Sequence, residues 1–209
     1  MYKNLKMITP ETIAKGISYQ TYLALTEQLL TEGKTTGPNQ SKEYVHYTEL
    51  NFHRMKRIFK TIHILPDLEQ VTKSISNKMT WIILTEAWCG DAAQNIPVIE
   101  KIAALNHKIE VIYLLRDENL ELMDQYLTNG GRSIPKLIAL DAETNEEVFT
   151  WGPRPAAIQK VMDQLKADGF AEISKIVEEI QKAYNEDKTV SVQKEMLHLL
   201  KNTTHAKLH

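Results

Sequence analysis

The chain has 209 residues, of which 43% are hydrophobic and 25% are charged. This length and composition suffice for one domain with a sizeable apolar core and some extensions. The formal net charge of −2 gives no electrostatic reason to expect binding to nucleic acid or to a membrane surface.

The N-terminal residues 1–8 lack a continuous apolar segment, and no stretch approaches the roughly 20 apolar residues of a membrane span. Cys89 is the only cysteine, so the chain has no disulfide framework, which is typical of a reducing compartment. We therefore expect a cytoplasmic protein. The histidines have no companion cysteines, so we expect no metal site.

The first part of the chain is expected to be helical. Apolar side chains at helical spacing predict helices over about 10–31 and 41–62, and Gly, Pro and Asn predict a loop at 32–40. Residues 57–64 fit either the end of the second helix or a strand. Pro66 ends whatever precedes it and begins a further helix.

Cys89 lies between a predicted strand and a predicted helix. Residues 79–85 are apolar and β-branched, as in a buried strand, and residues 91–105 have helical spacing. The free amides and the positive dipole end of that helix favour a thiolate. Asp91 and Glu86 oppose it with negative charge. We therefore expect a modestly reactive cysteine that is not strongly acidic.

The rest of the chain alternates strands and helices. The predicted elements are a parallel strand at 109–115, a helix over 120–127, two strands joined by a turn at 141–146, and helices at about 154–167, 169–184 and 190–202. Asp117 or Asn119 is expected to cap the first of these helices, which should end at residues 129–131. Because ligands of α/β sheets bind at the carboxyl ends of parallel strands, we expect the chemistry near Cys89 and Arg116.

Four features in register resemble the thioredoxin superfamily. Residues 88–90, Trp-Cys-Gly, follow a buried strand, and Pro97 follows Cys89 by eight positions, like the proline of the thioredoxin active-site helix. Residues 132–140 look like the segment that carries the family's cis-proline. Gly152 matches the glycine that follows the last strand.

The resemblance implies an α/β thioredoxin-like fold, a central mixed sheet flanked by helices, with extra N-terminal and C-terminal helices. It divides the chain into an N-terminal helical extension (1–78), a thioredoxin-like core (79–167) and a C-terminal helical extension (168–209), in one compact unit. The motif WCGDA at 88–92 looks like that of a bacterial thioredoxin-like family with a single cysteine.

The resemblance also implies a set of site residues. Cys89 is the expected nucleophile, and Ile134, before the expected cis-proline, is expected to pair its backbone with an extended substrate. The substrate-binding candidates are Trp88, Gly90, Ser133, Ile134, Pro135 and Arg116. Arg116 and Arg154 are candidates for binding an anionic group, and surface ion pairs are the alternative.

The chain departs from the dithiol pattern at two positions. Ala92 replaces the resolving cysteine, and Ile83 replaces the family's buried acid. The leading hypothesis is monothiol exchange, in which Cys89 attacks a protein disulfide or accepts a low-molecular-weight thiol and an external thiol resolves the product, without a cofactor. The alternative is a redox-inert binding protein that uses the groove between Trp88 and Pro135.

Two related families fit less well. Peroxiredoxins carry Thr or Ser three residues before the reactive cysteine and Pro seven before it, where this chain has Glu86 and Ile82. Monothiol glutaredoxins carry Cys-Gly-Phe-Ser, and here Asp91 replaces the aromatic residue. A glutaredoxin-like role is therefore only a distant third hypothesis.

Overall fold

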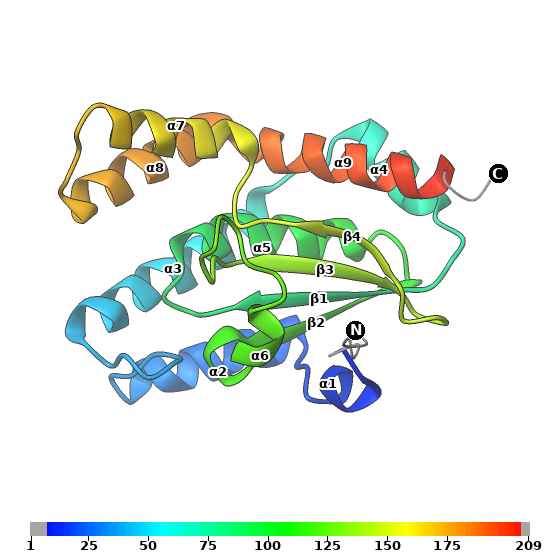
Figure 1. The fold of residues 1–209 in the computed structure, drawn as a ribbon, viewed down its shortest axis with the longest axis horizontal. Helices are drawn as coiled ribbons and strands as arrows, with labels where there is room; N and C mark the ends of the chain where they lie inside the picture. The colour runs from blue at the N-terminus through cyan, green and yellow to red at the C-terminus, as the bar shows by residue number, and fades with distance from the viewer. Residues whose placement is uncertain (1–7, 206–209) are drawn as a thin grey trace, which may run out of the picture.

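The structure, a computed structural model, describes residues 8–205. Its strands form one mixed sheet in the order β2-β1-β3-β4, which crosses the centre of Figure 1 with β4 uppermost and β2 lowest. The strands are β1 (Met79–Thr85), β2 (Ile109–Leu115), β3 (Lys136–Asp141) and β4 (Glu147–Trp151). The predicted strands are therefore confirmed.

Strand β1 occupies the middle of the sheet because all its residues are buried and most are large and apolar. It pairs in parallel with β2 and antiparallel with β3, so that Ile83 lies between Tyr113 and Leu137. Parallel neighbours need a crossover, which α5 (Gly90–Ala103) provides. The predicted strand, loop and helix around Cys89 are confirmed.

Helices flank this sheet, and further helices precede and follow it in the chain. Besides α5 they are α1 (Pro10–Ala14), α2 (Tyr19–Thr31), α3 (Lys42–Thr61), α4 (Pro66–Ser74), the 3-10 turn η1 (Arg116–Glu118), α6 (Leu120–Met123), α7 (Ala156–Ala167), α8 (Ile173–Asp187) and α9 (Val190–His205). In Figure 1, α2 lies beyond the β2 edge and α7, α8 and α9 lie beyond the β4 edge. The predicted fold class, a mixed sheet flanked by helices with additional terminal helices, is confirmed.

The single helix predicted over 10–31 is wrong, because the chain breaks between α1 and α2. Gly16 packs so closely on the sheet that a Cβ there would lie 2.7 Å from the Cβ of Ile112. The next residue, Ile17, exchanges two backbone hydrogen bonds with Tyr113, of 3.0 and 2.9 Å. This bridge satisfies part of the open β2 edge, which a continuous helix could not do.

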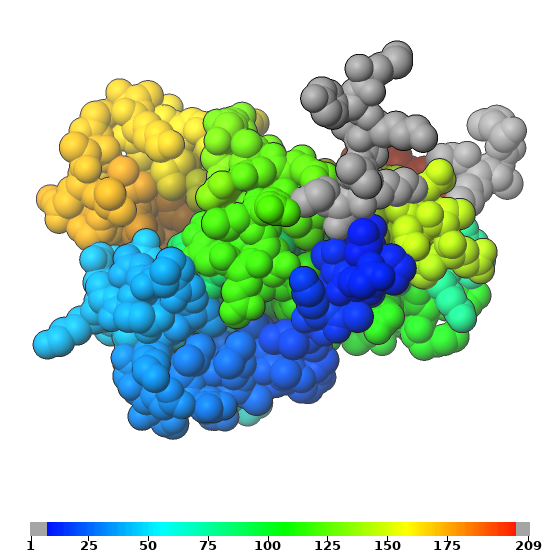
Figure 2. All heavy atoms as spheres, turned by 60° about the horizontal axis from the view of Figure 1, so that its bottom comes forward, coloured from blue at the N-terminus to red at the C-terminus, as the bar shows by residue number. Residues whose placement is uncertain are grey.

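The helix predicted over 120–127 is also too long. Only η1 and the one-turn α6 form, and the Asn119 side chain donates to the carbonyl of Leu115 instead of capping α6. The chain then continues in tight turns to Asn129, which has a left-handed conformation (φ 50°). Figure 2 shows this green segment between the blue N-terminal helices and the yellow and orange α7–α8 pair.

The other predicted boundaries shift by a few residues. Residues 57–64 belong mostly to the end of α3 and supply no strand. Helix α7 begins at Ala156 and α8 at Ile173, later than predicted. No helix within residues 8–205 combines the length and apolar character needed to cross a membrane.

The core consists of two clusters of unequal size. The main cluster joins both faces of the sheet to the N-terminal helices through residues such as Tyr22 and Met55, and to α9 through Met196. The small cluster lies between α7 and α8 and contains Ile158 and Ile180. The α7–α8 pair therefore has an apolar core of its own.

Candidate functional site

Cys89 is the residue that caps the N-terminus of α5. Its Sγ accepts a hydrogen bond from the backbone amide of Ala92 at 3.4 Å and donates one to the carbonyl of Ile134 at 3.3 Å. The Ile134–Pro135 peptide bond is cis. The helix start and the loop before β3 therefore meet at the sulfur atom.

The environment of Cys89 keeps its thiol protonated. Burial, and after it the charge of Asp91, raise the pKa of Cys89 to about 12, although the amides of Ala92 and Asp91 act in the opposite direction. The residue is 8% exposed. The expected negative influence of Asp91 is present, but burial exceeds it and Glu86 does not contribute. The helix terminus does not produce a thiolate here.

The position of the absent second cysteine is closed. Ala92 occupies that position, buried in the first turn of α5, with its amide bound to the sulfur. Gly152 packs against the other side of the Pro135 segment, with φ 113°, and a Cβ there would lie 2.2 Å from the carbonyl oxygen of Pro135. Only glycine allows the backbone to approach so closely.

Trp88 and Arg116 stack on one another beside the thiol loop. The guanidinium of Arg116 lies 4.9 Å from the centre of the Trp88 ring, and Tyr44 from α3 packs on the same indole at 5.0 Å. Arg116 also donates to Asp117 at 2.8 Å and to the carbonyl of Arg132 at 3.2 Å. Its charge is therefore already paired, as the alternative interpretation expected.

The N-terminal extension holds the loop before Cys89 through the main chain. Thr36 accepts a hydrogen bond from the amide of Ala87 at 2.9 Å, and Asn51 donates to the carbonyl of the same residue at 3.2 Å. Glu86 is fully buried, and its carboxylate accepts from the amide of Asp117 at 2.8 Å. Burial raises the pKa of Glu86. This carboxyl group therefore joins two loops and does not face the thiol.

Asp91 connects the start of α5 to the C-terminal extension. Its carboxylate accepts from the guanidinium of Arg154 at 2.5 Å and from the hydroxyl of Tyr184 at 2.8 Å. Asn95 donates to the same hydroxyl at 3.0 Å. The Arg154 and Asp91 side chains are only 15% and 13% exposed. Arg154 is thus an internal ion-pair partner in this structure.

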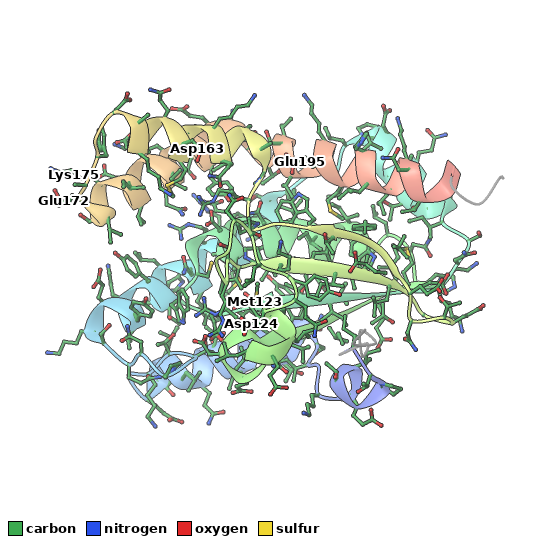
Figure 3. All side chains as sticks on the ribbon, viewed as in Figure 1. Met123, Asp124, Asp163, Glu172, Lys175 and Glu195 are labelled. Atoms are coloured by element: carbon green, nitrogen blue, oxygen red, sulfur yellow. The ribbon has the colours of Figure 1, made fainter. Side chains whose placement is uncertain are left out.

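Helix α8 covers the helix terminus beside the sulfur. A Cβ on Gly90 would lie 2.9 Å from Nε2 of Gln181, and Gln94 donates to Gln181 at 2.7 Å. Helix α9 braces the connection from β4 to α7, because Glu195, labelled in Figure 3, accepts from the Trp151 indole and from the Ala156 amide, both at 2.7 Å. Helix α8 therefore packs on the first turn of α5, next to the thiol.

Most of the predicted site residues lie near one another. The contacts above join Cys89 to Ile134 and Trp88 to Arg116, while Ser133 is half-buried in the loop before Pro135. The sequence reasoning missed the residues of the two extensions that hold the site. The polar side chains of these residues form no sequence motif. They also lie too far from Cys89 along the chain to form a periodic pattern with it. Within residues 8–205, no group of three or more His, Cys, Asp or Glu side chains is arranged to hold a metal ion.

The comparisons with solved structures concern the fold alone. A crystal structure of a protein of unknown function from Pseudomonas aeruginosa matches with a TM-score of 0.60 and 15% identity, covering 94% of this chain and 99% of that one. A crystal structure of an HIV epitope-scaffold matches with a TM-score of 0.51 and 16% identity, covering 84% and 97%. No curated protein matches the chain significantly.

A family model described as thioredoxin matches residues 37–166. The match includes the β1–Cys89–α5 unit, the Pro135 segment and Gly152, whose geometry is given above. It also includes α3, which packs against α5. Because this match spans more than half of the residues of the chain, the chain belongs to the thioredoxin family.

Proposed function

We propose that the chain is a monothiol member of this family that exchanges disulfides through Cys89 when α8 moves away. The observation that carries the proposal is the position of the sulfur, between the first amides of α5 and the carbonyl of Ile134. In the exchange, the Cys89 thiolate attacks a mixed disulfide and forms a new S–S bond while the partner thiolate leaves. An external thiol then attacks that bond, and Cys89 departs as the thiolate.

Displacement of α8 is part of the proposal because the covered thiol is a poor nucleophile. A pKa of about 12 leaves roughly one molecule in 10⁵ ionised at neutral pH. Water that reaches the sulfur would remove the burial that raises this pKa. The contacts of Gly90 and Gln94 with α8 are the ones that must open.

The remaining features of the proposal follow from the single sulfur. Trp88, Gly90, Ser133, Ile134, Pro135 and Arg116 would line the substrate path. We assign the chain to a bacterial-type, single-cysteine WCGDA group, with a protein disulfide or a low-molecular-weight thiol as partner, in the reducing cytoplasm that an external resolving thiol requires. The boundaries 1–78, 79–167 and 168–209 remain part of this proposal.

A second candidate function is a redox-inert binding protein. The raised pKa of Cys89, caused first by its burial, favours this candidate. The hydrogen bond from the thiol to Ile134 favours it as well, because it occupies the carbonyl that a substrate strand would use. In this case the sulfur is a small buried side chain and the extensions provide the binding surface.

One experiment separates the two candidates. The protein is incubated with hydroxyethyl disulfide and reduced glutathione, the formation of oxidised glutathione is followed, and the Cys89→Ser variant is the control. Turnover that requires Cys89, with a Cys89–glutathione adduct detected by mass spectrometry, supports exchange. Equal rates for the two proteins and no adduct would leave the redox-inert candidate.

A further inference from the structure

A cavity of about 430 Å³ lies where the end of α3, Gln94 of α5 and the junction of α8 and α9 meet. Its volume lies in the range of small-molecule sites. Its wall includes Arg57, Ile58, Ile62, His63, Tyr184 and Lys188. The cavity is therefore formed by both extensions.

The charged groups of this wall are all basic. No aspartate or glutamate lines the cavity, and neither Arg57 nor Lys188 forms an ion pair with any residue in the described part of the chain. The nearby carboxylate of Asp187 is bound to the amide and hydroxyl of Ser191. Burial, followed by the charge of Arg57, lowers the pKa of Arg54 on the same helix. The end of α3 thus carries positive charge that no acidic residue of the cavity wall balances.

The floor of the cavity is apolar. Ile58 is buried, Ile62 is half-buried, and the Tyr184 hydroxyl is already bound to Asp91 and Asn95, so Tyr184 offers chiefly its ring. A single inorganic ion would not use this surface. A ligand with both an anionic group and an apolar body would use the whole cavity.

The backbone at the α8–α9 junction is held in an unusual conformation. Lys188 and Thr189 both have positive φ values, 50° and 68°, and both line the cavity. For a β-branched residue such as Thr189 this conformation is rare and costs free energy. The turn between α8 and α9 thus brings both residues to the wall of the cavity.

We infer that this cavity binds a small organic phosphate. Its phosphate group lies between Arg57 and Lys188, and its apolar body packs on Ile58, Ile62 and the Tyr184 ring. Arg supplies forked N–H donors and Lys a compact charge, a combination suited to phosphate. The alternative is that the two cations only balance the free carbonyl groups where α3 and α8 end.

Calorimetric titration of the full chain with phenyl phosphate tests this inference. We expect saturable one-to-one binding that is stronger than that of inorganic phosphate, which lacks the apolar body, and of benzyl alcohol, which lacks the charge. The Arg57→Ala, Lys188→Ala double variant should bind at least tenfold more weakly, because it loses both charge-assisted contacts with the phosphate.

Lys60→Ala is the matched control, because Lys60 is an exposed cation on α3 that does not line the cavity. It should bind like the natural sequence. Absence of saturable binding would overturn the inference, and so would equal binding by the double variant or an equal loss with Lys60→Ala. Cys89→Ser should retain binding, so this result does not depend on the exchange chemistry. Unfolding curves of each variant verify that it is folded.

Discussion

The N-terminal extension and the α7–α8 pair both reach the Cys89 loop, but different forces attach them. The N-terminal helices share the main apolar core with the sheet and bind the Ala87 backbone directly. The α7–α8 pair has a small core of its own and is joined to α5 by polar side chains, above all by the bonds of Asp91 with Tyr184 of α8 and with Arg154, just before α7. Apolar burial is lost only by unfolding, whereas a few polar contacts can exchange with water. The pair is therefore the part of the structure that can move.

The largest effect should come from the glycine at which the chain leaves the sheet for α7. Gly152→Ala places a methyl group against the carbonyl of Pro135 and keeps a positive φ, so we expect a loss of about 4 kcal/mol in the free energy of unfolding. Gly130→Ala is the control, because Gly130 has a positive φ with no atom within 4 Å of the position that the new methyl group would take. It should cost about 1 kcal/mol. Urea denaturation measures both, and equal losses would contradict the close approach.

The next prediction compares the two apolar clusters. Met55→Ala opens a cavity in the main core and should lower the free energy of global unfolding by about 3 kcal/mol. Ile180→Ala removes a similar volume from the α7–α8 cluster and should release this pair alone. Hydrogen exchange at the β1 amides distinguishes them. Faster β1 exchange is expected for Met55→Ala only, and faster exchange in both variants would mean that the two clusters unfold together.

The sequence predicts the centre of this fold well for a physical reason. Strand β1 is buried on both faces and α5 is buried over most of its length, so each is marked by apolar residues close together in the sequence. The break at Gly16 depends on Ile112 and on the open β2 edge, which lie far along the chain. Local periodicity cannot contain that information.

The same limit applies to the candidate site. The placement of Cys89 at a helix terminus follows from local pattern, and the family resemblance anticipated its proximity to Ile134. The pKa did not follow, because the burial of Cys89 in the main core and the pairing of Asp91 with Arg154 involve residues distant in sequence. The charge of Asp91, known from the sequence, gives the direction of one effect on the pKa of Cys89. The extent of burial, which has the larger effect, is known only from the folded structure.

The third prediction concerns the pH dependence that this burial causes. The pKa of Cys89 is about 12 in the folded chain, against about 8.5 when unfolded. Only the unfolded thiol ionises between these values, so its contribution to stability is complete below pH 8.5 and is lost as the pH rises toward 12. The loss should be about 2 kcal/mol at pH 10. Urea denaturation at pH 8, 9 and 10 measures it, with Cys89→Ala as reference, and parallel pH curves for the two proteins would contradict the buried thiol.

The smallest effects come from single hydrogen bonds, one from each extension. Tyr184→Phe removes the hydroxyl that joins α8 to Asp91 and Asn95. It should raise the rate of Cys89 alkylation by iodoacetamide about tenfold and lower the free energy of unfolding by about 1 kcal/mol, because this contact is absent in both the opened and the unfolded chain. Thr36→Val leaves the buried Ala87 amide unpaired, and it should lower the free energy of unfolding by about 1–2 kcal/mol.

A matched control isolates the role of the Tyr184 hydroxyl. Tyr47→Phe removes a hydroxyl that reaches only the exposed Glu43 on α3, so it should leave the alkylation rate unchanged. Thr36→Val should leave the alkylation rate unchanged, because opening of α8 alone keeps the bond from Thr36 to Ala87. If Thr36→Val instead raises the alkylation rate in proportion to its loss of stability, the two extensions open together. The α7–α8 pair would then not move alone, and access to Cys89 would require unfolding of the whole chain. An alkylation rate that responds to Tyr184→Phe and not to Thr36→Val would assign the access route to α8, because a local opening breaks only the first of these two contacts.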